Sequence, residues 1–106
     1  MARIERRVTP YGDIEYGVTV AEDGTTRVER FECKDSKSIS FNETRYPDGR
    51  TTIERVEHPT GDKDFDIVFL PDGSRIVGRI EHANGKKHLN LVTEAEGRTT
   101  EAGPTQ

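Results

Sequence analysis

The sequence predicts an all-β protein, an antiparallel meander of eight strands rolled into a small barrel. Three observations lead to this fold class. Turn glycines recur at Gly24, Gly49, Gly73 and Gly97, a period of 24 to 25 residues. Apolar and polar residues alternate between these turns, as they do in half-buried strands, and no stretch shows the 3.6-residue period of an amphipathic helix. The alternative for the same repeat is an elongated single-layer sheet of stacked hairpins.

The first half of the chain matches the second half at an offset of 49 residues. Ile4-Glu5-Arg6 falls on Ile53-Glu54-Arg55, and Asp23-Gly24 falls on Asp72-Gly73. A match in both strand and turn residues indicates an internal duplication. The predicted pseudo-repeats are 1–49 and 50–98.

Turn residues separate eight stretches that are typical of strands. Residues 9–13 join the first two, because Pro10 and Gly12 supply the fixed and the positive φ of a short turn, and Asp-Gly or Asn-Gly pairs follow several later strands. We expect strands at 2–8, 14–20, 25–33, 39–46, 51–58, 64–70, 74–82 and 87–92. Apolar side chains become rare after residue 92, so 1–92 is predicted to be one β-meander domain and 93–106 a polar tail that frays or adds one short edge strand.

The alternation assigns a set of side chains to the barrel interior. This inward set includes Ile4, Val8, Ile14, Tyr16, Val18, Val20, Phe31, Ile39, Phe41, Phe65, Ile67 and Phe69. Three apolar pairs break the alternation because their members are three residues apart: Val28 and Phe31, Ile53 and Val56, Val77 and Ile80. We expect a β-bulge between the members of each pair, at Glu29-Arg30, Glu54-Arg55 and Gly78-Arg79, which would bring both to one face. The alternative is that both faces of the sheet are partly covered.

Composition and charge bound the function. The chain has 106 residues, 30% of them hydrophobic, and a net charge of -4 in which 16 basic residues are interleaved with 20 acidic ones. This acidic balance disfavours nucleic-acid binding and favours a basic protein partner. A thin core makes self-association an expected property. A lone cysteine, no signal-peptide h-region and no apolar run of bilayer-spanning length predict a cytoplasmic protein that does not enter membranes.

Two sets of metal-ligand residue types occur. The zinc-type set is Cys33, His58 and His82, and the calcium-type set is Asp62, Asp64 and Asp66. Equivalent positions two strands apart are separated by about 9–10 Å, too far for side chains that must converge on one zinc ion. The position at which a calcium loop needs glycine is Ile67. We therefore expect no metal and no cofactor.

Arginines recur at one position of successive units, each with a glutamate two residues later. This column comprises Arg30, Arg55 and Arg79 with Glu32, Glu57 and Glu81. One interpretation is a set of cross-strand ion pairs that only fix the register of the sheet. The other is a recognition surface for a partner, and these six residues are the predicted binding site.

Two segments carry a family resemblance, Tyr46-Pro47-Asp48-Gly49-Arg50-Thr51-Thr52 and Ala83-Asn84-Gly85-Lys86-Lys87. Their strand–turn–strand pattern resembles the bacterial MORN-type and YD-type β-hairpin repeats in period and in turn residues. The resemblance implies a binding or assembly scaffold rather than an enzyme.

The sequence contains no nucleophile elbow, no phosphate-cradling glycine loop and no other catalytic motif, so we predict no enzymatic activity. We expect a protein–protein interaction module, such as a small phage or bacterial inhibitor that occludes a partner's surface. The alternatives are a small-molecule-binding β-barrel and a structural or assembly β-repeat protein.

Overall fold

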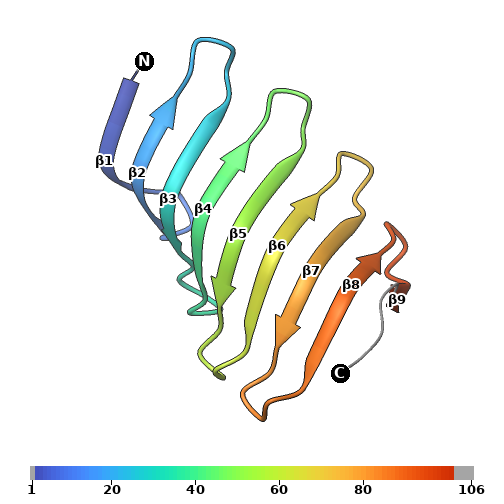
Figure 1. Cartoon of the computed structure of the whole chain (residues 1–106). Helices are drawn as coiled ribbons and strands as arrows, with labels where there is room; N and C mark the ends of the chain where they lie inside the picture. The colour runs from blue at the N-terminus through green and yellow to red at the C-terminus, as the bar shows by residue number, and fades with distance from the viewer. Residues whose placement is uncertain (1, 102–106) are drawn as a thin grey trace.

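The computed structural model describes residues 2–101, which form nine antiparallel strands in one sheet (Figure 1). Each strand pairs with the next one along the chain, so the predicted antiparallel meander is confirmed. Short β9 lies in the stretch predicted as a polar tail or edge strand. The strands are β1 (Ala2–Val8), β2 (Ile14–Val20), β3 (Thr26–Glu32), β4 (Ile39–Arg45), β5 (Thr51–Glu57), β6 (Lys63–Phe69), β7 (Arg75–Glu81), β8 (Lys87–Thr93) and β9 (Thr99–Glu101).

The sheet is open, and the predicted barrel is wrong. β1 and β9 stand at the two ends of the strand order and do not pair with each other. The register gives the reason. Pairs such as Ile4↔Val18 and Arg6↔Tyr16 are symmetric about the middle of each strand, and the same symmetry continues to β8, so the middle residues form a straight line across the sheet. A barrel closes only when the register is staggered by a fixed shear, which this sheet lacks.

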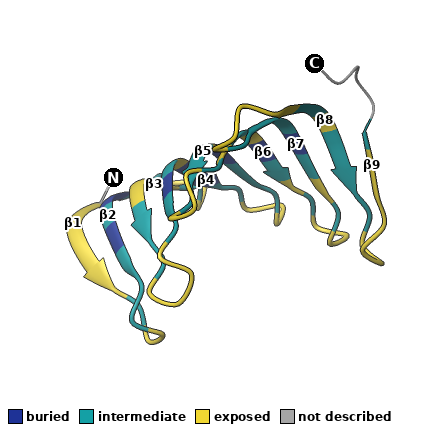
Figure 2. Ribbon diagram, turned by 90° about the horizontal axis from the view of Figure 1, so that it is seen from below, coloured by how far each residue is buried: buried dark blue, intermediate teal, exposed yellow. Residues whose placement is uncertain are grey.

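The overall dimensions agree with an open sheet. The principal extents are 42 × 28 × 21 Å, and the radius of gyration of the Cα atoms is 14.7 Å. A compact domain of this length would have a radius of gyration of about 13 Å. The single-layer alternative therefore describes the protein (Figure 2).

Short turns of one design hold the register. In the turn 9–13 the Thr9 amide donates to the Asp13 carbonyl (2.8 Å), and the Gly12 amide donates to the Thr9 carbonyl (2.9 Å). This is a type I turn followed by a left-handed glycine, and the same pattern recurs with glycine φ values of 90–101°. The loop 33–38 is one residue longer and places Lys37 at φ 62° instead.

These turns explain the sequence period. A seven-residue strand and a five-residue turn make a unit of twelve residues, so two units give 24, and the longer loop 33–38 lengthens one period to 25. The repeating unit of the structure is thus one strand with its turn. The 49-residue duplication remains a prediction.

Every second strand carries a left-handed residue at its middle. These residues are Gly17 (φ 63°) in β2, Asn42 (56°) in β4, Asp66 (56°) in β6 and Asn90 (54°) in β8. Glycine, asparagine and aspartate are the residue types that tolerate this conformation best. The residues on either side keep the same register, so no residue is inserted and the predicted bulges at 29–30, 54–55 and 78–79 are wrong.

The apolar pairs of β5 and β7 nevertheless lie on one face, which is the arrangement that the bulges would explain. Ile53 and Val56 are three residues apart and belong to one apolar cluster, as do Val77 and Ile80. A regular strand would turn the members of each pair to opposite faces. Both members of each pair therefore lie on one side of the sheet, and the alternation is interrupted between them, at the middle residues that face Asn42, Asp66 and Asn90.

The core is a single row of side chains. It consists of Val18, Val28, Ile53, Ile67 and Val77, which are 0–8% exposed. Register pairs connect these residues across β2–β7, with Glu43 between Val28 and Ile53. Val56, Ile80 and Leu91 pack against its C-terminal half. We call this side of the sheet the apolar face. Buried residues lie at the middle of the central strands, whereas β1 is exposed (Figure 2).

Three aromatic residues of the predicted interior lie on the opposite side. Tyr16, Phe41 and Phe65 each precede a left-handed residue, and each pairs in register with an arginine. Arg55 is adjacent to Val56 of the apolar cluster, so it and its register partners point away from that face. The inward assignment of these aromatic residues was wrong because the alternation reverses at Gly17, Asn42 and Asp66. We call this side the arginine face.

Replacing Asp66 tests the left-handed positions. Asp66→Val is expected to lower the free energy of unfolding by about 1–2 kcal/mol, because a β-branched residue is strained at positive φ, whereas Asp66→Gly should change it by only a few tenths of a kcal/mol. Lys63→Val is the matched control, since Lys63 is an exposed residue of the same strand without positive φ, and valine suits a strand with ordinary dihedrals. Urea unfolding measures all three. Equal losses for the two valine variants would contradict the assignment.

Candidate functional site

The arginines of the predicted binding site lie in one straight row on the arginine face. Each occupies the same position in β3, β5 or β7, and the strands between them contribute an aromatic or leucine side chain to the same row. In order across the sheet the row is Arg6, Tyr16, Arg30, Phe41, Arg55, Phe65, Arg79 and Leu89. The structure therefore brings together the three arginines that the sequence singled out, about 9–10 Å from one to the next.

Each of these arginines lies near an aromatic ring, and Arg55 and Arg79 stack closely on theirs. The guanidinium carbon of Arg79 lies 4.1 Å from the ring centroid of Phe65, and that of Arg55 lies 4.4 Å from Phe41. Arg30 lies between two rings, 5.9 Å from Tyr16 and 6.0 Å from Phe41. Cation–π contacts of this kind hold a guanidinium plane in place and contribute about 0.5–1 kcal/mol each at exposed sites.

Each arginine also pairs with the predicted glutamate two residues later. An arginine with its ring and its glutamate is called a unit of the row. The nitrogen–oxygen distance is 2.7 Å between Arg30 and Glu32, 3.0 Å between Arg55 and Glu57, and 2.8 Å between Arg79 and Glu81. For Arg55 and Arg79 the closest nitrogen is Nε, whose N–H is not aligned for a hydrogen bond, so these contacts are ion pairs. The arginine side chains remain 38–46% exposed.

This arrangement presents three oriented, half-exposed guanidinium groups beside three carboxylates. The rings restrict each guanidinium plane while one side stays open to solvent. Ordering these side chains in advance reduces the entropy lost on binding. The surface can therefore form charge-assisted hydrogen bonds with a partner that spans several strands.

Sequence reasoning missed the aromatic members of the row. Tyr16, Phe41 and Phe65 recur at intervals of 25 and 24 residues, the same period as the turn glycines. That periodicity was a usable signal, but the strict two-residue alternation assigned these rings to the interior.

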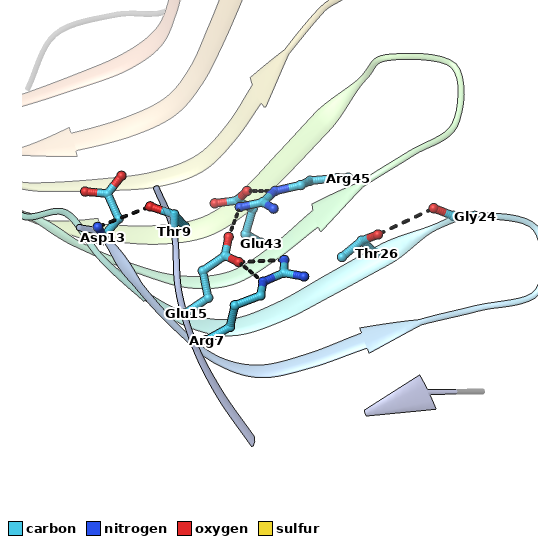
Figure 3. A network of polar contacts seen from close by, with 8 residues as sticks. All are labelled: Arg7, Thr9, Asp13, Glu15, Gly24, Thr26, Glu43 and Arg45. Carbon is cyan, nitrogen blue, oxygen red and sulfur yellow. Dashed lines mark hydrogen bonds and ion pairs between the residues drawn. The ribbon is translucent and has the colours of Figure 1, made fainter. Parts of the chain in front are cut away.

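A second polar cluster lies on the apolar face and joins β1, β2 and β4 (Figure 3). The Glu15 side chain is 2% exposed and accepts hydrogen bonds from Arg7 Nε (2.8 Å) and Arg45 Nη2 (2.6 Å). Arg45 also pairs with Glu43, a buried member of the central row. The bridge between β2 and β4 crosses β3 on the side that carries Val28, which is 1% exposed.

The protonation of Glu15 follows from these partners. Burial by itself raises the pKa of the Glu15 carboxyl, but the hydrogen bonds and positive charges of Arg45 and Arg7 outweigh it, and the pKa lies below its ordinary value. The carboxylate is thus charged at neutral pH. Two arginines that share one buried carboxylate make the cluster a structural clamp.

The predicted metal-ligand residue types do not converge. His58 Nε2 lies 2.9 Å from Asp64, and His82 Nδ1 lies 3.5 Å from Asp62. Asp66 is the left-handed residue of β6, and Cys33 is a free thiol. Among residues 2–101 no group of three or more ligand side chains could hold a metal ion. The same residues include no helix long and apolar enough to cross a membrane.

Comparison with known proteins found no matching family model and no matching curated protein. Solved structures with a similar arrangement include the TCP10c domain of Drosophila melanogaster Sas-4, with 11% identity, a TM-score of 0.25, and coverage of 97% of this chain and 98% of that one. The SAS-4 TCP domain in complex with a proline-rich motif of Ana2 gives the same identity and TM-score and covers 97% and 89%. The TCP10 domain of Danio rerio CPAP with a STIL peptide gives 14%, a TM-score of 0.14 and 99% of both chains. TM-scores this low carry no argument about this chain.

Removing the Glu15 carboxylate tests the clamp. At pH 7, Glu15→Gln is expected to lower the free energy of unfolding by about 2–3 kcal/mol, less than for a fully buried pair because Arg7 and Arg45 are 41% and 36% exposed. A carboxyl with a depressed folded-state pKa contributes stability above its unfolded pKa, about 4.3, and loses it as pH falls towards the folded value. The difference between variant and wild type should therefore shrink below about pH 4.5.

Exposed Glu22 in the turn 21–25 supplies the control, Glu22→Gln, which should match wild type at both pH values. Urea unfolding at pH 7 and pH 3 gives the comparison. A Glu15→Gln deficit that stays the same at pH 3 would show that the charge of Glu15 is not what stabilises the sheet.

Proposed function

We propose that this protein is an interaction module that binds a partner protein through the arginine face. The observation that supports the proposal is the row of three equivalent units, in which Arg55 and Arg79 stack closely on an aromatic ring, Arg30 lies between two rings, and all three arginine side chains are partly exposed. Arginine and aromatic residues are enriched in protein interfaces and dominate their binding energy.

A purely structural role explains less of this arrangement. Ion pairs between exposed side chains contribute about 0.2–1 kcal/mol each, so fixing the register needs no aromatic partner. The turns already fix the register through backbone hydrogen bonds. The arginines add a repeated set of charged side chains that crosses most of the sheet.

The charge pattern indicates the kind of partner. Each unit presents a positive and a negative group, so the row favours a partner surface that alternates carboxylates with basic side chains. At long range the net charge of -4 favours a basic partner. A protein of this kind acts as an inhibitor by covering a functional surface of its partner, and it needs no catalytic group to do so. A small phage or bacterial inhibitor in the cytoplasm fits this proposal.

The small-molecule alternative depended on a barrel interior. The described residues form an open sheet instead, so the enclosed cavity of that hypothesis is absent from residues 2–101. The interaction proposal depends on no cavity.

Replacing all three arginines of the row by lysine tests the proposal. Lysine keeps the charge but loses the planar fork, so the free energy of unfolding should change by less than about 1 kcal/mol, while partner binding should weaken several-fold or more. The control replaces Arg75 and Arg98, exposed arginines outside the row, by lysine. Quantitative pull-downs from the host compare wild type, row variant and control.

Proteins enriched by wild type and by the control, but lost from the row variant, are the expected partners. If the row variant retains every protein that wild type captures, the arginine face is not the docking surface. Urea unfolding of the same three proteins shows that a loss of binding does not come from a loss of folding.

A further inference from the structure

β1 is an edge strand of the sheet, and its outer side is free among the described residues. Residues 3–8 are all exposed. Ile4 is 40% exposed, whereas Val28, its equivalent in β3, is 1% exposed. An edge with exposed apolar side chains and unpaired backbone groups can pair with another extended segment.

The sheet itself shows which kind of segment fits such an edge. On the side that corresponds to the free edge of β1, β3 pairs with β2, β5 pairs with β4, and β7 pairs with β6. These three partner strands share an aromatic residue followed directly by a left-handed one: Tyr16-Gly17, Phe41-Asn42 and Phe65-Asp66. The aromatic residue lies opposite an arginine, and the left-handed residue lies opposite the middle residue of the receiving strand.

β1 has the same residue pattern as β3 and β5, which receive such partner strands. Its Ile4-Glu5-Arg6 corresponds to Val28-Glu29-Arg30 of β3 and Ile53-Glu54-Arg55 of β5, in sequence and in register. The shortest cation–π contacts of the row, those of Arg55 and Arg79, are made with the ring of the preceding strand. Arg6 begins the row. No strand of residues 2–101 precedes β1, so no aromatic ring from a preceding strand lies opposite Arg6.

We propose that the free edge of β1 binds an extended segment of a partner protein by antiparallel strand addition. The segment places an aromatic side chain on Arg6, glycine, asparagine or aspartate opposite Glu5, and an apolar side chain opposite Ile4. The segment has acidic flanks like those of β2, where Glu15 pairs with Arg7. Arg3 and Arg7 of β1 already have carboxylate partners within the sheet, so the flanking carboxylates add to existing ion pairs. The inference rests on the proposed function only in that the partner is a protein.

The edge is selective because the residue opposite Glu5 must adopt a left-handed conformation. An ordinary strand with a β-branched residue at the middle position would have to adopt a strained conformation to copy β2, β4 or β6. The edge therefore discriminates against most aggregation-prone segments while accepting one pattern.

A labelled peptide, Ile-Glu-Phe-Asn-Val-Glu-Val, is the probe for this site. Fluorescence anisotropy with the full chain should show binding, and the same peptide with valine in place of asparagine should bind at least about fivefold more weakly. Arg6→Ala should weaken the asparagine peptide several-fold by removing the stacking partner. Arg98→Ala is the control, because Arg98 is exposed in the turn 94–98, and it should leave the affinity unchanged.

Amide resonances map the position of the peptide. Shifts and new protection from hydrogen exchange confined to β1 support strand addition at this edge. Equal binding of the two peptides, no binding at millimolar concentration, or shifts centred on β8 and β9 or on either face of the sheet would overturn it. A concentration-dependent dimer that Arg6→Ala abolishes and that excludes the peptide would show that a second copy occupies the edge, which also overturns the proposal.

The test is separate from that of the arginine face. The variant with lysine at positions 30, 55 and 79 keeps β1 intact, so it should bind the peptide as wild type does. Failure of the peptide to bind would leave the pull-down result unaffected. Failure of the pull-down to depend on the three arginines would equally leave the peptide result unaffected.

Discussion

The left-handed residue at the middle of every second strand is the constraint on which the rest of the structure depends. A flat sheet with regular alternation would spread Ile53 and Val56 over opposite faces. In this sheet, Asn42 and Asp66 on either side of β5 adopt positive φ, both side chains lie on one face, and the central row is buried. A single-layer sheet thereby obtains a core without a second layer.

This core is small and needs support from elsewhere. Five buried apolar residues form the row. The backbone hydrogen bonds between strands, the repeated glycine turns and the Glu15 clamp also stabilise the sheet. Each of them fixes strands whose side chains bury little area. The clamp is located where the row changes from apolar residues to Glu43, so a charged network stabilises the part of the sheet that apolar packing covers least.

The same geometry produces both proposed interaction sites. The straight register aligns equivalent residues of successive strands, so one arginine per repeat becomes a continuous row rather than scattered charges. It also leaves the sheet without the stagger that would close it, and β1 remains an edge with the receiving pattern of an inner strand. The arginine face offers side-chain recognition, and the edge offers backbone pairing.

The sequence by itself determined the strands, their turns and their order, because Asp-Gly and Asn-Gly turns and apolar alternation act within a few residues of each other. It also predicted that Arg30, Arg55 and Arg79 share one surface, since a fixed period in a meander aligns equivalent positions. The line of glycine, asparagine and aspartate at 17, 42, 66 and 90 was visible as a periodic signal, but its φ values depend on pairing with neighbouring strands. Only the tertiary structure decided between barrel and open sheet, the face of Tyr16, Phe41 and Phe65, and the meeting of Glu15 with Arg45 across β3. Closure depends on how the register accumulates over many strands. The face of the three rings depends on the backbone conformation at residues 17, 42 and 66, and the clamp depends on a contact between strands that are not adjacent.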